Sequence, residues 1–97
     1  MPTYISLVSW TEQGLGSFKE SVDRAEAANA LTAKFGGRMK DIYWTLGPYD
    51  IVVVSEAPDD ESATAFALEL GALGNVRTTT MRAFDSGEMR AIVAKTG

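Results

Sequence analysis

Neither histidine nor cysteine occurs among the 97 residues of the chain, which limits the chemistry that it could perform. Histidine is the usual general base near neutral pH and the commonest metal ligand, and cysteine is the usual thiol nucleophile. Proton transfer would therefore depend on a carboxylate, a lysine, an arginine or a tyrosine. No catalytic triad and no metal-ligand cluster can be assembled from what remains, so we expect neither a metal site nor a cofactor.

Tyr49 and Asp50 are the first candidates, because they stand where a turn leads into an apolar run. A carboxylate desolvated at that point could have a raised pKa and accept a proton from a substrate. Alternatively, Asp50 accepts backbone amides of its own turn and Tyr49 packs over it as an aromatic lid. Turn chemistry favours the second interpretation.

Charged clusters elsewhere are also candidates. Arg77 and Arg82 could bind a ligand carboxylate, although arginines in an edge strand more often form surface or intersubunit ion pairs. The run Asp59-Asp60-Glu61 does not predict a cation site, because consecutive positions in a first helical turn point in different directions. These acids are typical of a helix N-terminus instead.

The overall composition narrows the class of partner. The net charge is −4, which disfavours phosphate backbones and anionic lipids, so we expect neither a nucleic-acid nor a membrane partner. With 45% hydrophobic and 23% charged residues, the chain should form one folded domain. No apolar run could span a bilayer and no signal peptide follows Met1, which predicts a cytoplasmic location.

The first half of the chain predicts a strand followed by a helix. Residues 4–10 are rich in β-branched and aromatic side chains, and Ser17 and Glu20 have the spacing of a capping box. An apolar stripe follows at helical spacing, and Gly36-Gly37 ends it. The stripe consists of Phe18, Val22, Ala25, Ala28, Leu31 and Phe35.

The second half predicts a hairpin, a helix and a final strand. Residues 38–46 alternate as an edge strand, 47–50 form a turn, and the β-branched run 51–54 indicates a central strand. Asp59 is the expected N-cap of a helix that ends near Gly74, and residues 76–84 alternate again.

The resulting order β-α-β-β-α-β predicts an α+β, ferredoxin-like fold. Two right-handed β-α-β units joined by a hairpin place two helices on one face of a four-stranded antiparallel sheet, with the first and third strands in the middle. We expect this domain to span residues 1–85. Residues 86–97 would be a tail, interpreted as an intersubunit arm with Met89, Ile92 and Val93 on its contact face.

The other face of the sheet should then be open, and strand parity predicts which side chains lie on it. We place there Tyr4, Ser6, Val8, Tyr43, Thr45, Thr78, Thr80 and Arg82. Hydroxyls, aromatic rings and a guanidinium could orient a small, partly polar ligand. The same residue types are also typical of a wet dimer interface, which remains the alternative.

Three separated sequence blocks resemble the GYD-domain family. They are residues 44–50 (WTLGPYD), residues 56–60 (EAPDD) and residues 74–84 (GNVRT and TMRAF around Thr79). The family's Gly, Tyr and Asp match Gly47, Tyr49 and Asp50, with Pro48 inserted. The resemblance implies a ferredoxin-like monomer akin to the dimeric α/β barrels, whose open sheet faces pack together. It implies no established activity, because the family is largely uncharacterised.

The leading hypothesis is a small homo-oligomer that binds a small molecule in a cleft on the open sheet face. Its expected ligand-binding residues are Tyr4, Tyr43, Tyr49, Asp50, Thr80 and Arg82. One alternative is a cofactor-independent isomerase or oxygenase in which Asp50 or Tyr43 handles the proton and Arg82 binds the substrate anion. Another alternative is a purely structural oligomerisation module.

Overall fold

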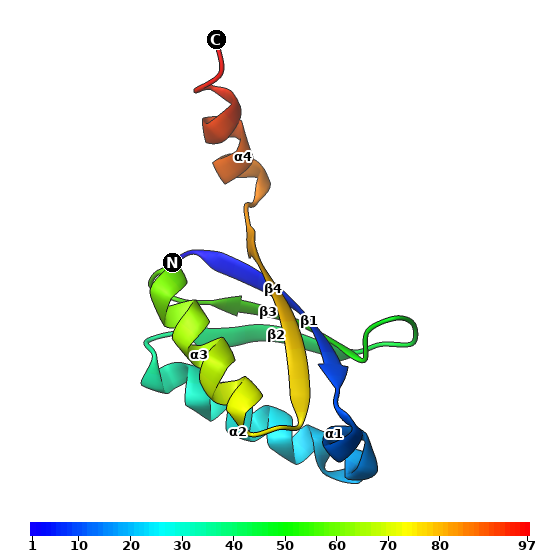
Figure 1. Cartoon of the computed structure of the whole chain (residues 1–97). Helices are drawn as coiled ribbons and strands as arrows, with labels where there is room; N and C mark the ends of the chain where they lie inside the picture. Colours follow the sequence, from blue (N-terminus) through cyan, green and yellow to red (C-terminus); the bar gives the residue numbers. More distant parts are fainter.

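A computed structural model describes residues 1–97, and it contains one four-stranded antiparallel sheet with two long helices on one face (Figure 1). The strands are β1 (Thr3–Trp10), β2 (Arg38–Trp44), β3 (Ile51–Glu56) and β4 (Val76–Ala83). The helices are α1 (Glu12–Gly16), α2 (Ser21–Lys34), α3 (Asp60–Ala72) and α4 (Ser86–Val93), with a 3-10 turn at Phe18–Glu20. The ferredoxin-like fold predicted from the sequence is therefore confirmed.

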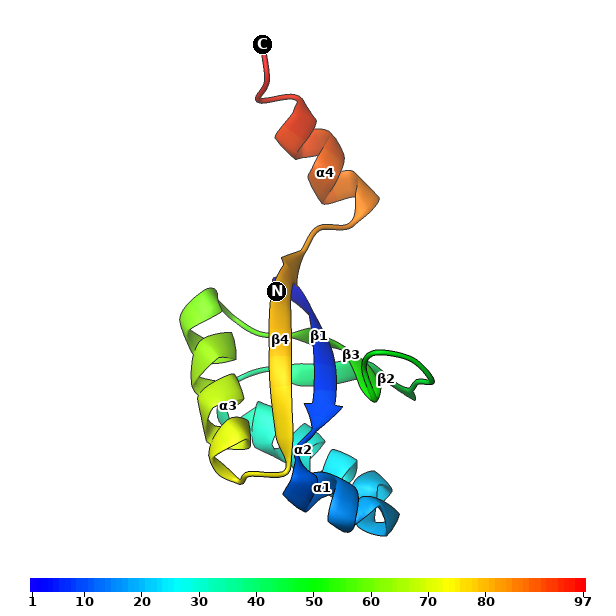
Figure 2. The same ribbon diagram turned by 45° about the vertical axis from the view of Figure 1, so that its right-hand side comes forward.

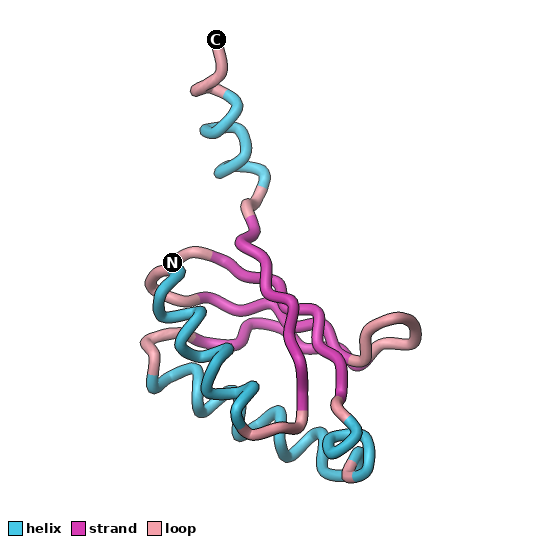
Figure 3. Tube along the Cα trace, viewed as in Figure 1, coloured by secondary structure: helices cyan, strands magenta, loops and turns pink.

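The strand order is β2-β3-β1-β4, so the two strands expected in the middle of the sheet do lie there. β1 pairs with both of its neighbours along most of its length, from Thr3 opposite Glu56 to Trp10 opposite Val76. β2 pairs with β3 and contains a bulge between Met39 and Asp41. Figure 3 shows the four strands as one layer, with the hairpin between β2 and β3 extending beyond it.

The start of the first long helix differs from the predicted capping box at Ser17 and Glu20. The chain turns helical earlier, at α1, whose N-cap Thr11 accepts a hydrogen bond from the backbone of Gly14. A 3-10 turn follows, and α2 begins only at Ser21 without a side-chain cap. Ser17 is occupied elsewhere, because its hydroxyl donates to the carbonyl of Gln13.

The second long helix begins as predicted. The carboxylate of Asp59 accepts a hydrogen bond of 2.7 Å from the backbone N–H of Ser62, which caps α3. Hydrogen bonding by the side chain of Ser62, and then by its backbone N–H, holds the pKa of Asp59 below its ordinary value. Gly74 follows the helix with φ of 85°, a left-handed conformation that lets the chain turn directly into β4.

The predicted facing of β1 and β4 is wrong. The hydroxyl of Tyr4 donates to Asp60 at the N-terminus of α3, and Ser6 and Val8 line a cavity beneath the helices. Ser6 in turn shares a hydrogen bond with Thr80. On these strands the even-numbered residues therefore face the helices. The members of the predicted open face that lie on the helix side are Tyr4, Ser6, Val8, Thr78, Thr80 and Arg82.

The face that the helices leave free carries the opposite parity. It includes the aliphatic, aromatic, thioether and hydroxyl side chains of Ile5, Leu7, Tyr43, Val52, Val54, Thr79 and Met81, which we call the open sheet face. Tyr43 is thus the one predicted ligand-binding residue on it. The helix-facing side of β1 and β4 carries polar side chains whose hydroxyls form hydrogen bonds with one another and with α3.

The tail forms a regular helix that stands away from the body of the molecule (Figure 2). Asp85 and Glu88 form a capping box at the N-terminus of α4, with the Asp85 carboxylate accepting from the backbone of Glu88 at 2.7 Å. Because α4 projects from the sheet, the chain is elongated and measures 52 × 30 × 18 Å along its principal axes. None of the helices has the length and apolarity needed to cross a membrane.

Candidate functional site

A cavity of about 310 Å³ lies between the sheet and helices α2 and α3. Twenty residues line it, and 14 of them are hydrophobic. Its floor is the helix-facing side of β1, β2 and β3, and its roof is formed by α2 and α3. The volume falls at the lower end of the range for small-molecule sites in proteins, roughly 300–1,000 Å³.

The cavity exists because α2 presents small side chains to the sheet. Ala25 and Ala28 lie where the predicted apolar stripe should pack, and neither fills the space beneath the helix. Two larger members of that stripe, Phe18 and Val22, are more than half exposed, at 54% and 57%, whereas Leu31 lines the cavity beside the alanines. Alanines on the inner face of a helix leave a gap that bulkier residues would close.

The two helices meet at one end of the cavity. There the rings of Phe35 and Phe66 form an edge-to-face pair with centroids 6.4 Å apart, and Lys34 forms an ion pair of 2.9 Å with Glu69. Further along, the exposed side chain of Ala27 also lines the cavity. The space beneath α2 and α3 is partly open to the surface.

The apolar walls of the cavity are accessible to water, because the space is partly open to the surface. A ligand that covered these walls would remove apolar area from water and would thereby stabilise the folded chain.

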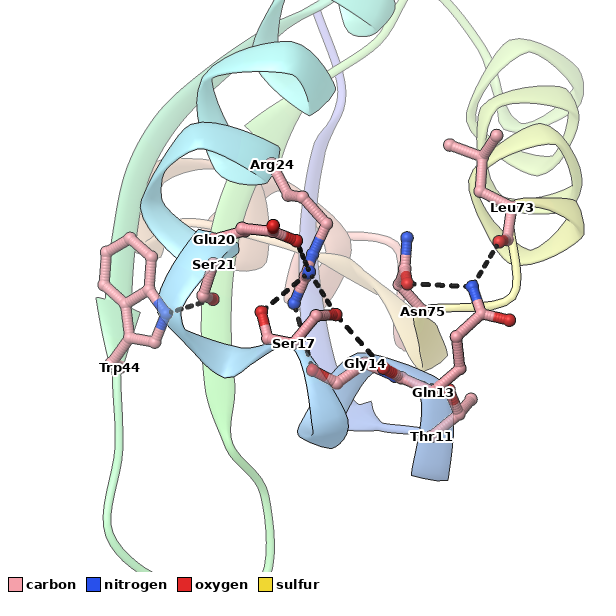
Figure 4. A network of polar contacts seen from close by, with 10 residues as sticks. All are labelled: Thr11, Gln13, Gly14, Ser17, Glu20, Ser21, Arg24, Trp44, Leu73 and Asn75. Atoms are coloured by element: carbon pink, nitrogen blue, oxygen red, sulfur yellow. Dashed lines mark hydrogen bonds and ion pairs between the residues drawn. The ribbon is translucent and has the colours of Figure 1, made fainter.

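A network of polar contacts fixes the N-terminal helix α1 at the other end of the cavity (Figure 4). Thr11 donates its hydroxyl proton to the carbonyl of Gly74 at 2.5 Å. The side-chain amide of Gln13 donates to the carbonyl of Leu73 and to Asn75 at 3.1 and 3.0 Å. These contacts clamp α1 onto the connection between α3 and β4.

Arg24 completes the network from α2. Its guanidinium donates to the carbonyl and hydroxyl of Ser17 and to the carbonyl of Gly14, at 3.0, 2.8 and 3.1 Å (Figure 4). Glu20 lies 3.6 Å away. Although Arg24 lines the cavity, most of its hydrogen-bonding capacity is directed to the C-terminal end of α1. It closes this end rather than offering a free charge to a ligand.

Tyr4 and Arg82 lie opposite each other at the ends of β1 and β4 that are farthest from α1. Tyr4 is 4% exposed and donates to Asp60 at 2.5 Å. Burial and then the Asp60 hydrogen bond raise the pKa of Tyr4 to about 12, while Arg82 opposes the shift. Arg82 contacts the carbonyls of Thr3 and Ala83 and pairs with Glu88 of α4 at 3.4 Å. It links the sheet to α4.

The hairpin candidates Tyr49 and Asp50 both make contacts that hold the backbone. The Asp50 carboxylate accepts the backbone N–H of Trp10 at 2.9 Å, and the Asp50 backbone N–H donates to Val8. The carbonyl of Tyr49 accepts the hydroxyl of Thr45 at 2.6 Å. Asp50 therefore binds a backbone amide, as the alternative interpretation expected, but that amide belongs to β1 and not to its own turn.

The six predicted ligand-binding residues are not brought together. Asp50 adjoins Val8 whereas Arg82 lies opposite Tyr4, a separation of about 14 Å along β1 at roughly 3.4 Å per residue. Tyr43 lies on the opposite side of the sheet and is 61% exposed. The proposed proton acceptor and anion binder of an isomerase or oxygenase therefore do not share one pocket.

Sequence reasoning missed the cavity beneath the helices. The sequence feature that could have indicated the cavity is the pair of alanines at positions 25 and 28, which occupy the inner face of α2. We interpreted them as members of a packed stripe because alanine is compatible with both close packing and a void. Trp10 and Ser55 also line the cavity. Strand alternation alone did not show which face of the sheet their side chains occupy.

Comparisons with known proteins agree with the fold. The sequence model of the GYD domain matches residues 4–93. A protein from Thermus thermophilus, named glutamine synthetase and cystathionine beta-lyase binding protein, is 35% identical over 92 residues, covering 94% of this chain and 97% of the relative.

Two solved structures show the same architecture. TTHA0845, also from Thermus thermophilus, is 24% identical with a TM-score of 0.57, covering 89% of this chain and 96% of that one. MtbAldR is 16% identical with a TM-score of 0.69 and covers 88% of this chain. This chain corresponds to about half of MtbAldR, 52% of its length. At these identities the likeness concerns the fold alone.

Proposed function

Because the chain belongs to the GYD domain family, and because its sheet carries an apolar surface that no helix covers, we propose that it is a self-associating binding protein that acts through contacts with other proteins. The observation that carries this proposal is the open sheet face. A free, apolar sheet face needs cover, and large exposed apolar patches mark protein interaction sites.

A second copy of this chain is the proposed occupant of the open sheet face. Its centre is apolar across adjacent strands, because Val54, Ile5 and Met81 stand in one cross-strand row and Val52 and Leu7 in the next. Asp41 and Arg77, at the two outer strands, surround this centre with charge. An apolar centre with a charged rim is the usual anatomy of an interface, and the same face on both copies suits two-fold packing.

Sedimentation equilibrium tests this association. Met81→Glu places a charge on the open sheet face, and Leu68→Glu places the same charge on an exposed apolar residue of α3; the two side chains are 43% and 71% exposed. We expect the unmodified chain and Leu68→Glu to have at least twice the monomer mass, and Met81→Glu to be monomeric. A monomeric unmodified chain, or equal masses for both variants, would contradict the proposal.

The hairpin between β2 and β3 is the proposed contact for a protein partner. Leu46 in its loop is fully exposed, and the loop is held shut by Thr45, whose backbone N–H donates to the Asp50 carbonyl at 2.8 Å. A preformed loop loses little conformational entropy on binding. By its name, the Thermus relative binds glutamine synthetase and cystathionine beta-lyase, which supports enzymes of these two kinds as partners here.

Biolayer interferometry with purified glutamine synthetase and cystathionine beta-lyase tests this assignment. We expect saturable binding of at least one enzyme, weakened about tenfold or more by Leu46→Asp and unchanged by Leu68→Asp. If neither enzyme binds, these partners are wrong. If both variants bind like the unmodified chain, the hairpin is not the contact.

A further inference from the structure

We propose that the cavity beneath α2 and α3 is a binding site for a neutral, mainly apolar small molecule of about the size of a two-ring aromatic compound. The cavity of 310 Å³ has roughly twice the volume of an apolar cavity that accepts benzene. The proposal goes beyond the protein-binding function, because the site lies on the helix side of the sheet and the self-association surface lies on the other.

The charge of the ligand follows from the lining. No aspartate, glutamate or lysine lines the cavity, and Arg24 is the one charged side chain among the 20 lining residues. Its guanidinium already donates to Ser17 and Gly14. A charged ligand would lose its hydration on entering the cavity and would find no free group of opposite charge there. This loss is costly in an apolar space. A neutral molecule has no such cost.

Among the hydroxyls that line the cavity, that of Ser55 has no hydrogen-bond partner in the protein. Thr32 donates to the carbonyl of Asn29, Ser21 accepts the indole N–H of Trp44, and Ser6 pairs with Thr80. The Ser55 hydroxyl, by contrast, forms no hydrogen bond with a protein side chain or carbonyl. It lies on the helix-facing side of β3 and lines both this cavity and the smaller one next to it. A ligand with one hydrogen-bonding group could therefore be oriented by Ser55.

Three matched probes test the chemistry of the site: naphthalene, 2-naphthol and 2-naphthoate. Calorimetric titration at pH 7 should detect binding of naphthalene and 2-naphthol, with 2-naphthol bound more tightly, and no binding of the carboxylate. Ser55→Ala should remove the preference for 2-naphthol over naphthalene. Tighter binding of 2-naphthoate would overturn the neutral-ligand assignment, and failure of both neutral probes would overturn the site.

A filling substitution tests the location. Ala28→Phe puts a ring into the cavity from the inner face of α2, whereas Ala30→Phe puts the same ring on an exposed position of that helix. We expect Ala28→Phe to raise the thermal unfolding midpoint and to weaken 2-naphthol binding by about tenfold or more. Ala30→Phe should change neither property.

The two measurements keep the outcomes separate. If Ala28→Phe lowers the unfolding midpoint while Ala30→Phe does not, the space beneath α2 is already filled in solution and the proposal is wrong. If Ala28→Phe is stable but binds 2-naphthol as tightly as the unmodified chain, the probe binds elsewhere and the proposal is equally wrong. Neither result would affect the sedimentation test of self-association.

Discussion

At the scale of single residues, the polar side chains that looked suited to chemistry mostly hold the backbone together. The Asp50 carboxylate accepts an amide of β1, and Arg82 ties β4 to α4, whereas Tyr49 takes part only through its backbone carbonyl. Their residue types could be recognised from the sequence. Their roles could not, because a buried carboxylate or guanidinium satisfies the nearest backbone group, and which group is nearest depends on the assembled sheet.

Tyr4 gives a pH-dependent prediction. Its pKa is raised to about 12 by burial and by the Asp60 hydrogen bond, so the folded state retains the phenolic proton more strongly than the unfolded state does. Tyr4 therefore contributes its full stability below the ordinary tyrosine pKa of 10.0, and this contribution is lost as the pH rises from about 10 to about 12.

Denaturant unfolding at several pH values measures this effect. Part of the decline in stability between pH 10 and pH 12 should disappear in Tyr4→Phe, which cannot ionise. The exposed Tyr43→Phe serves as the matched control and should decline like the unmodified chain. The same decline in all three proteins would show that Tyr4 ionises with an ordinary pKa.

Two glycines in α1 give a second prediction. A Cβ added at Gly14 would lie 1.9 Å from the carbonyl oxygen of Asn75, whereas one added at Gly16 would meet no atom within 4 Å. Gly14→Ala must push α1 away from the β4 connection and should cost about 1–3 kcal/mol of unfolding free energy. Gly16→Ala should be neutral or slightly stabilising. Urea unfolding compares them, and equal stabilities would show that α1 does not pack closely there.

At the scale of elements, the sequence predicted the number, type and order of the principal strands and helices. It was less informative about where α2 begins and which way the strands face. Residues 17–20 match a capping box, yet α1 precedes them and uses Thr11 as its cap. A local pattern of this kind identifies a helix start only when no earlier turn competes for the same backbone groups.

Strand facing was unpredictable for a different reason. In β1 both parities contain apolar residues, with Tyr4 and Val8 on the helix side and Ile5 and Leu7 on the open side. Alternation tells inside from outside when one face meets water. Where a helix layer covers one face and the other face is itself apolar, the two parities look alike. The open sheet face was expected, but most of the side chains assigned to it were wrong for this reason.

The corrected helix start leads to a third prediction. Thr11 caps α1 and also contacts Gly74, so Thr11→Ala should lower the unfolding free energy by about 1–2 kcal/mol. Glu20→Ala should change it by less than about 0.5 kcal/mol, because Glu20 is exposed and has an ion pair of 3.6 Å instead of a capping contact. Chemical denaturation of the two variants measures both changes in unfolding free energy. A larger loss for Glu20→Ala would restore the capping-box interpretation.

At the scale of the whole molecule, the chain presents separate surfaces for separate contacts. The open sheet face lies on one side, the cavity lies between the sheet and its helices, and α4 stands off one end (Figure 2). An isolated helix of eight residues is marginal in water, so α4 depends on its capping box and on Arg82. Its side chains Met89 and Val93 are about half exposed, at 48% and 54%.

A fourth prediction concerns this tail. We expect removal of residues 86–97 to leave the thermal unfolding midpoint of the domain nearly unchanged, because α4 has few contacts with the rest of the chain. If α4 is the intersubunit arm proposed from the sequence, the same truncation should weaken self-association in sedimentation equilibrium. Unaltered association would show that the open sheet face acts without the arm.

The two apolar faces of β1 also have a consequence for how accurately the chain folds. A slip of one residue in strand pairing normally exposes a hydrophobic row and is rejected, but here a slip would exchange one apolar row for another. The hydrogen bonds of Tyr4 to Asp60 and of Ser6 to Thr80 form only in the native alignment. These two polar contacts therefore favour the native strand register, which hydrophobic burial alone would not distinguish from a register shifted by one residue.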